Sequence, residues 1–400
     1  MIRLGLDSTR YLCEKLGNPQ IELDHIHIAG TNGKGSVGAF ISTILKCHGL
    51  RVGHYSSPAV FCDNEIIRVN NVNISKKDYA AGMEEIDRIC DAIEDEDMIP
   101  TEFERQTCLA FKYFRDKKCD IVVLECGMGG ESDATNVIED PLECIFTSIS
   151  MDHMQYLGDS LHKISLNKAG IIRDNALIYT SNTEKIVIEA IKSVASLHGC
   201  KVNIIEPDNK LQKVISLSGD FQIINASLAF AAVKGLQGYK LKSGKNVDIS
   251  YKKMENGLHN TKWPGRFELI NTKPDIIMDG AHNPGAAKAL RKALDSRYKG
   301  KKDIIFVTGM LSDKDHDGVL SALIKDAVHV LCVSTTGARG MSASLLSETA
   351  SRYNDKVTSV GGVFEAMDTA LMLAQKSSVI VVCGTLSIEK EVRKWKDMRL

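Results

Sequence analysis

Residues 26 to 36 read Ile26-His27-Ile28-Ala29-Gly30-Thr31-Asn32-Gly33-Lys34-Gly35-Ser36. This order is typical of a short buried strand, a tight glycine loop and a helix that begins near Val37. Such a loop turns successive backbone N–H groups inward, and the N-terminus of the helix adds a partial positive charge. We therefore expect a phosphate site, with Lys34 reaching the outer phosphates of a nucleotide. The alternative is an ordinary glycine-rich turn between a strand and a helix.

The spacing differs from the common phosphate-loop motif, in which a serine or threonine directly follows the lysine. Here Gly35 follows Lys34, and the hydroxyl comes one residue later at Ser36. The motif Gly-Lys-Gly-Ser at a strand-to-helix junction still favours nucleotide binding over a plain turn.

A second apolar run, from Asp120 to Glu125, shows no alternation of polar and apolar residues, which predicts a strand buried on both faces. It ends in a carboxylate. A strand of this kind is the usual partner of a phosphate loop, because it brings a magnesium ligand to the same edge of the sheet. Further strand and helix patterns alternate along the first half of the chain. They predict an α/β domain with a doubly wound, mostly parallel sheet.

A chain of 400 residues is too long for one hydrophobic core, so we expect two domains. We predict a nucleotide-binding α/β domain over residues 1–266 and a smaller Rossmann-like α/β domain over residues 267–400. The second prediction rests on apolar strands near 275–278, 303–308, 329–333 and 379–383, which helix-length segments separate.

Composition points to an ordinary globular protein, with 44% hydrophobic and 25% charged residues. A net charge of -1 gives no electrostatic reason to expect nucleic acid or a membrane as a partner. The first residues lack the apolar core of a signal peptide, and the 11 cysteines are scattered and odd in number. We expect free thiols, a cytoplasmic location and a monomer.

Seven motifs occur in a fixed order along the chain, and together they resemble the folylpolyglutamate synthase/dihydrofolate synthase family of the Mur ligase superfamily. They are Gly30 to Ser36, Ser56-Ser57-Pro58, Asp133-Ala134-Thr135-Asn136, Asp152-His153 with Leu157-Gly158, Lys168-Ala169-Gly170-Ile171, Trp263-Pro264-Gly265-Arg266 and Asp279-Gly280-Ala281-His282-Asn283-Pro284. The resemblance covers nearly the whole chain.

The resemblance implies an ATP-dependent amide ligase that adds L-glutamate to (dihydro)folate or dihydropteroate through an acyl phosphate. It implies that Lys34 and the loop residues Gly30, Thr31, Asn32, Gly33, Gly35 and Ser36 hold the phosphates. By similarity, Ser57 and Glu125 bind a first Mg2+, and His153 with Glu125 approaches a second. Lys168 corresponds to a carbamylated lysine of the family, whose anionic oxygen suits Mg2+. Its plain alternative is a solvated helix lysine.

In the second half, the resemblance implies that Gln222 and Asn225 contact the adenine region. Arg266 and Asp279 would close over the nucleotide, and His282 would lie near its ribose or phosphates. Asp279 ends a predicted strand and His282 lies in the following turn, which fits a loop site at the carboxyl edge of a sheet. A histidine that only stabilises the turn is the alternative for His282.

Three positions depart from the family pattern. Ala59, Ile66 and Glu131 stand where the family commonly has a histidine and two arginines. Losing two guanidinium groups and gaining a carboxylate lowers the positive potential that would attract polyanionic substrates. A Mur-type ligase with a non-folate acceptor would show this pattern, and random drift in peripheral loop residues would show it too. A catalytically silent nucleotide-binding protein or switch is a separate alternative.

Overall fold

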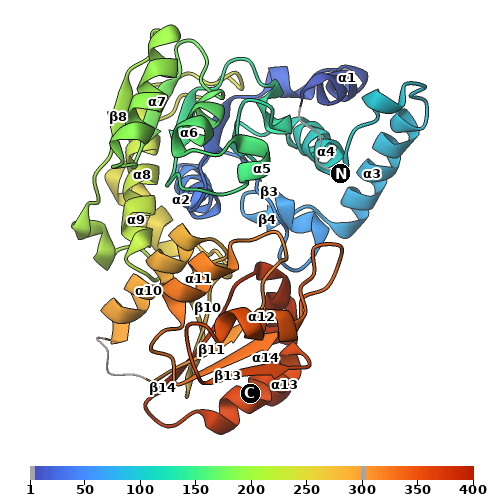
Figure 1. Ribbon diagram of the computed structural model, residues 1–400. Coiled ribbons are helices and arrows are strands. Elements are labelled where there is room, and N and C mark those ends of the chain that lie inside the picture. The colour runs from blue at the N-terminus through green and yellow to red at the C-terminus, as the bar shows by residue number, and fades with distance from the viewer. Residues whose placement is uncertain (1–4, 299–302) are drawn as a thin grey trace. The chain divides into compact units, whose positions relative to one another are not determined.

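The computed structural model describes residues 5–298 and 303–400. The chain divides into two compact units. The first runs to Ser216 and resumes over Ile223–Lys262, and the second comprises Leu217–Gln222 and Trp263–Leu400. Each unit contains one β-sheet with helices packed against it (Figure 1). The predicted α/β class, with a larger and a smaller doubly wound domain, is confirmed.

The sheet of the first unit has the strand order β4-β3-β2-β5-β1-β6-β7-β8. The six strands β2, β5, β1, β6, β7 and β8 are parallel to one another. At the edge beside β2, β3 and β4 pair antiparallel. The strands are β1 (His25–Ala29), β2 (Val52–Tyr55), β3 (Ile67–Val69), β4 (Val72–Asn73), β5 (Ile121–Glu125), β6 (Glu143–Phe146), β7 (Leu177–Thr180) and β8 (Val202–Ile204). The strand before the glycine loop, β1, is thus central, between β5 and β6.

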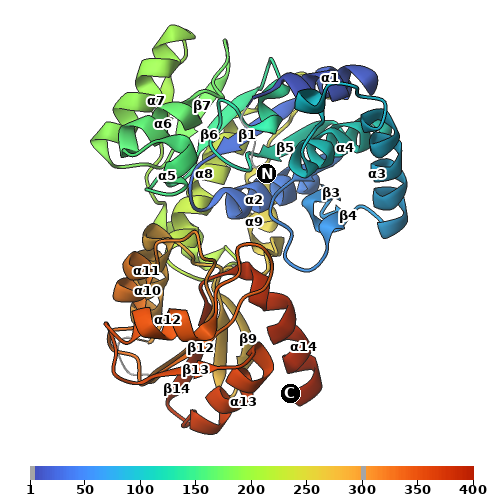
Figure 2. The ribbon, with the colours of Figure 1, turned by 45° about the vertical axis from the view of Figure 1, so that its right-hand side comes forward.

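Helices cover both faces of this sheet. They are α1 (Asp7–Lys15), α2 (Lys34–Cys47), α3 (Lys76–Cys90), α4 (Glu102–Asp116), α5 (Met154–Leu157), α6 (Leu161–Ala169), α7 (Lys185–Leu197), α8 (Phe221–Gly235) and α9 (Tyr251–Asn260). One face packs against α1 and α4 through Leu124 and against α6 and α7 through Ile178. The other face carries α2, whose Gly38 lies against His54 of β2. Figure 2 shows α2 beside α9, with which it packs.

The sheet of the second unit has the order β13-β12-β11-β14-β10-β9, with β9 antiparallel at one edge. Its strands are β9 (Glu268–Thr272), β10 (Asp275–Met278), β11 (Asp303–Thr308), β12 (His329–Val333), β13 (Val357–Val360) and β14 (Ser378–Cys383). The helices α10 (Pro284–Tyr298), α11 (His316–Leu323) and α12 (Ala343–Ala350) contribute to one core. The helices α13 (Val363–Leu373) and α14 (Glu389–Arg399) contribute to the core on the other face.

Several short or polar elements escape the hydrophobic patterns. The edge strands β3 and β4 have three and two residues, too few for a hydrophobic pattern, and α9 is a polar helix. The strand β13 is half-exposed, so it shows no apolar run. Helix α2 begins at Lys34 rather than near Val37, so the lysine already belongs to the helix. Within the described residues, no helix has the length and apolar character to span a membrane.

Candidate active site

The glycine loop leaves β1 and enters α2 between two close neighbours. Gly30 has φ +153°, and a Cβ there would collide with Thr147 Oγ1. Gly33 has φ +95°, and a Cβ there would stand 2.7 Å from Asn225 Oδ1. Only glycine fits both the backbone conformation and the space at these two positions.

Backbone hydrogen bonds hold the tip of the loop against the segment that follows β6. The N–H groups of Thr31 and Asn32 donate to Ser148 O at 2.7 and 3.1 Å. The Thr31 hydroxyl donates to Ser150 O and accepts from Ser150 N, both at 3.0 Å. The loop is therefore fixed in place by a neighbouring segment of the same sheet edge.

Lys34 turns back over this loop. Its Nζ donates to the carbonyls of Gly30 at 3.2 Å and Thr31 at 3.5 Å, and it lies 3.8 Å from Glu125 Oε1. Glu125 is the last residue of β5, which pairs with β1. The predicted phosphate lysine and the predicted metal carboxylate thus meet at one sheet edge.

Lys168 reaches the same point from α6. Its Nζ donates to Gly30 O at 2.9 Å, and the side chain is buried. Burial, followed by the positive charge of Lys34, lowers the pKa of Lys168 to about 7. Gly130 lies against the backbone of Lys168, where a Cβ would stand 2.6 Å from its carbonyl oxygen. The solvated helix lysine that we considered as an alternative is excluded by this burial.

Ser57 follows β2, which lies next to β5. The register pairs Tyr55 with Leu124, so Ser56 comes opposite Glu125 and Ser57 lies one residue further along the chain. The preceding Ser56 accepts a hydrogen bond at 2.9 Å from Nη1 of Arg68, a residue of β3. The sequence motifs do not single out Arg68, although it lies two residues after Ile66.

Ile66 does not border this site, contrary to our expectation from the sequence. Its side chain is 2% exposed and belongs to the core that includes Leu12 and Phe111. Glu131 is exposed and Ala59 half-buried.

His153 lies in a tight turn just before α5. Its φ is +51°, an uncommon conformation outside glycine, and its Nε2 lies 3.9 Å from Asp152 Oδ1. The negative charge of Asp152 also acts on Lys168. The turn that carries His153 is therefore within electrostatic reach of the buried lysine.

Gln222 and Asn225 lie in the first turns of α8. Gln222 is fully buried, and Asn225 packs against Gly33 of the loop. Their contact with adenine stays a prediction.

In the second unit, Arg266, Asp279 and His282 lie where the segment around Gly265 contacts the segment that follows β10. Asp279 follows β10, and its carboxylate accepts from Phe267 N at 2.8 Å and from Ala281 N at 2.9 Å. Gly280 N donates to Gly265 O at 3.0 Å, and His282 Nδ1 bonds to Gly280 O at 2.8 Å. Burial raises the pKa of Asp279, while Arg266 and the backbone donors oppose that shift.

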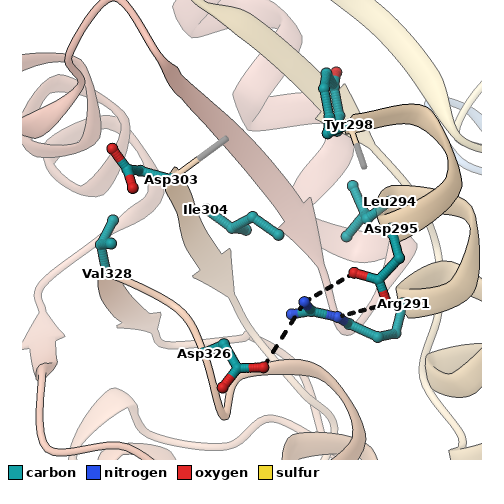
Figure 3. A pocket seen from close by; sticks show the side chains of 8 residues that line it. All are labelled: Arg291, Leu294, Asp295, Tyr298, Asp303, Ile304, Asp326 and Val328. Carbon is teal, nitrogen blue, oxygen red and sulfur yellow. Dashed lines mark hydrogen bonds and ion pairs between the residues drawn. The ribbon is translucent and has the colours of Figure 1, made fainter. Parts of the chain in front are cut away.

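A pocket of about 320 Å³ also lies in the second unit, near the start of β11 (Figure 3). Its lining includes Asp303 and Asp326, and Arg291 pairs with Asp295 at 2.9 Å. The strands β10 and β11 both run parallel to β14, so this pocket lies at the opposite sheet edge from Asp279. It is not part of the candidate site.

The donors at the loop fit a magnesium ion only together with a nucleotide. Across residues 5–298 and 303–400, no three histidine, cysteine, aspartate or glutamate side chains cluster as a metal site. Ser57 and Glu125 offer one hydroxyl and one carboxylate. Mg2+ is commonly bound by one or two carboxylates plus waters and substrate phosphates, so this sparse set matches its chemistry.

Two family models match the chain. The Mur ligase middle domain matches residues 28–176, and the Mur ligase glutamate ligase domain matches residues 265–386. Among curated proteins, the chain is 34% identical to the dihydrofolate synthase/folylpolyglutamate synthase of Haemophilus influenzae, over 96% of this chain and 91% of that protein.

Solved structures extend the likeness to the whole fold. The Escherichia coli FolC in complex with DHPP and ADP is 29% identical with a TM-score of 0.85, covering 100% of this chain and 94% of that one. The Yersinia pestis bifunctional folylpolyglutamate synthase/dihydrofolate synthase complexed with AMPPNP and Mn ion is 27% identical with a TM-score of 0.83, covering 100% and 94%. The chain belongs to the folylpolyglutamate synthase/dihydrofolate synthase family of the Mur ligases.

Proposed function

We propose that this protein is an ATP-dependent ligase that joins L-glutamate to (dihydro)folate or dihydropteroate. One observation carries the proposal: Lys34 and Lys168 converge on the Gly30 carbonyl beside Glu125, at the end of a phosphate loop. Membership of the family supports the choice of substrates, since relatives are named for both reactions.

The chemistry asks the protein mainly to position groups and to neutralise charge. The acceptor carboxylate attacks the γ-phosphorus of ATP, which gives an acyl phosphate and ADP. The amino group of glutamate then attacks the acyl carbon, and phosphate leaves as the amide forms. Lys34 and the loop N–H groups that do not donate to Ser148 O would bind the β- and γ-phosphates, because the N-terminus of a helix favours anions.

Ser57 and Glu125 would hold a first Mg2+, and His153 with Glu125 would approach a second. When bound, the metal neutralises charge on the phosphates of the nucleotide. The side-by-side exit of β2 and β5 supports the first set. The second set rests on the family resemblance.

We also propose that Lys168 is carbamylated. The amine nitrogen would bond to the carbon of CO2 and lose a proton, which turns the side chain into an anion. With a pKa of about 7, a large share of the amine is neutral and nucleophilic near neutral pH. The product anion would attract Lys34, whereas the unmodified ammonium repels it. Added acetate should partly rescue the activity of Lys168→Ala.

The remaining residues complete the proposal. Gln222 and Asn225 would contact the adenine, and Arg266, Asp279 and His282 would also bind the nucleotide. Residues 1–266 would act as the ATP-binding domain and residues 267–400 as the glutamate-ligase domain. We further expect a cytoplasmic monomer with neither nucleic acid nor a membrane as a partner.

The test is ADP release by the purified protein with ATP, Mg2+ and glutamate, in the presence of each acceptor separately. We expect release that depends on dihydropteroate, on a folate or on both, and none with the Lys34→Ala protein. A non-folate carboxylate that alone supports release would identify a different acceptor. Tight ATP binding without release for any acceptor would show a silent paralogue and contradict the proposal.

A further inference from the structure

The residues around Ser57 form a loop, residues 56–65, whose first residue and middle are held by side chains from the short stretch 65–68. We call it the Ser57 loop. Before Ser57, the Ser56 hydroxyl accepts from Arg68 Nη1 at 2.9 Å. After Ser57, the Glu65 carboxylate accepts from the N–H groups of Val60 at 3.2 Å and Phe61 at 3.1 Å.

Arg68 is well suited to hold Ser56 in a fixed position. Its Nε donates to Asn73 Oδ1 at 3.0 Å, so the guanidinium bridges β4 and the end of β2. A planar guanidinium that donates in two directions orients its partners more strictly than a lysine does. Ser56 itself is buried, and its N–H donates to Ile66 O at 3.0 Å. The residue before Ser57 is therefore tied by both its side chain and its backbone.

Arg68 also lies within the electrostatic reach of the site. Burial lowers the pKa of Arg68, and the negative charges of Glu65 and then Glu125 act in the opposite direction. Glu65 is 8% exposed, so its carboxylate serves the interior of the loop rather than the solvent. Arg68 thus contacts the first residue of the Ser57 loop, and Glu65 contacts its middle.

We propose that Arg68 and Glu65 are positioning residues that fix the Ser57 hydroxyl for the metal of the nucleotide complex. The inference rests on the proposed function, in which Ser57 is a metal ligand. Residues that orient a metal ligand through hydrogen bonds are commonly worth about 10- to 100-fold in metal affinity or activity. A purely structural brace would change stability without changing the response to the metal.

The experiment measures ADP affinity by calorimetry with and without Mg2+, so it needs no acceptor and no turnover. For Arg68→Met we expect the Mg2+-dependent gain in ADP affinity to fall by about 10-fold or more. ADP affinity without Mg2+ should stay within about 3-fold of wild type, since Lys34 and the loop are intact. Binding of Mn2+ in the presence of ADP, followed by electron paramagnetic resonance, should weaken in parallel.

Matched variants separate positioning from folding. Arg115→Met is the control, because it also removes a half-buried guanidinium of the same unit. Arg115 Nη1 donates to Leu16 O at 3.1 Å, on the face of the sheet that α1 covers. This variant should leave the Mg2+ response unchanged. Glu65→Gln keeps a side-chain acceptor oxygen and should retain most of the response, whereas Glu65→Ala should lose it. Thermal unfolding of every variant records the change in stability.

A double-mutant cycle tests the Arg68–Ser56 contact directly. If Arg68 acts through Ser56, Arg68→Met combined with Ser56→Ala should be no worse than Arg68→Met alone, because interacting residues are not additive. Fully additive losses would overturn the inference, as would an unchanged Mg2+ response in Arg68→Met. A wild-type protein whose ADP affinity ignores Mg2+ would overturn the proposed function and the inference together.

Discussion

The phosphate loop, Gly30 to Ser36, and the Ser57 loop lie at the same edge of one sheet, but they are held in different ways. The phosphate loop is fixed mainly through its backbone, by hydrogen bonds to Ser148 and by the close approach of Thr147 and Asn225. The Ser57 loop is fixed by the side chains of Arg68 and Glu65.

This difference explains which motif keeps its family pattern. A loop that depends on positive φ and on close backbone approach requires glycine, so its sequence is constrained position by position. A loop that a few side chains hold leaves the other positions freer. Ala59 is half-buried in the Ser57 loop and departs from the pattern, while Glu65 and Arg68 hold the geometry.

Lys34→Ala should produce the largest loss. The Lys34 ammonium lies at the phosphate loop, 3.8 Å from Glu125 Oε1, and its removal takes a positive charge away from that carboxylate. We expect acceptor-dependent ADP release to fall by about 100-fold or more, the usual effect of removing one preorganised group that stabilises developing charge. The unfolding temperature should barely change. Activity within a few-fold of wild type would contradict the proposed role of the loop.

Gly33→Ala tests whether backbone geometry sustains the phosphate loop. The substitution forces alanine to φ +95° and places its Cβ 2.7 Å from Asn225 Oδ1. We expect ATP affinity to fall by about 10- to 100-fold, which corresponds to strain of about 1–3 kcal/mol.

Gly49→Ala is the matched control for this change. Gly49 has φ +87°, but no atom lies within 4 Å of the position that a Cβ would take there, so the variant bears the strain without the contact. It should lower stability by about 1 kcal/mol and leave ATP affinity unchanged. Equal losses of affinity in both variants would show that the contact with Asn225 is irrelevant.

The sequence alone was sufficient for the phosphate loop, the β5 carboxylate and the two α/β units, because each depends on local patterns of glycine and buried apolar runs. It was insufficient for the Ser57 loop. Ile66 occupies a position where the family has arginine, and only the fold shows that this side chain enters the core. The contact of Arg68 with Ser56 depends on the antiparallel pairing of β2 and β3. No periodic pattern of hydrophobic residues in the sequence predicts this pairing.

Lys168 gives a prediction on pH. Its pKa of about 7 lies below the ordinary value because burial and Lys34 disfavour the charged form, so the neutral amine dominates above that pH and the ammonium below it. Only the neutral amine reacts with CO2. From about pH 8 to about pH 6 the share of neutral amine falls about 10-fold. At a fixed CO2 concentration, carbamate and activity should fall with it, and more steeply, because carbamate formation also releases a proton.

Carbon-13 NMR with labelled CO2 measures the carbamate directly, and the signal should be absent from Lys168→Ala. That variant should also lose activity. Wild-type protein without a carbamate signal at any pH in this range would refute the modification, as would near wild-type activity of Lys168→Ala.

Glu131→Arg should have the smallest effect, and it tests whether loss of charge near the loops alters the choice of acceptor. Glu131 is exposed. Its N–H donates at 2.9 Å to the carbonyl oxygen of Asn167, the α6 residue that directly precedes Lys168. Exposed charges act through screened water, so reversing this one should lower the KM for a polyanionic acceptor by less than about 3-fold and leave kcat unchanged. The same reversal at the exposed Glu206 should have no effect on the KM. A change in this KM above about 10-fold, or a switch of acceptor, would instead mean that Glu131 contacts the acceptor directly. The positions that depart from the family pattern would then matter for acceptor specificity as much as the glycines do for phosphate binding.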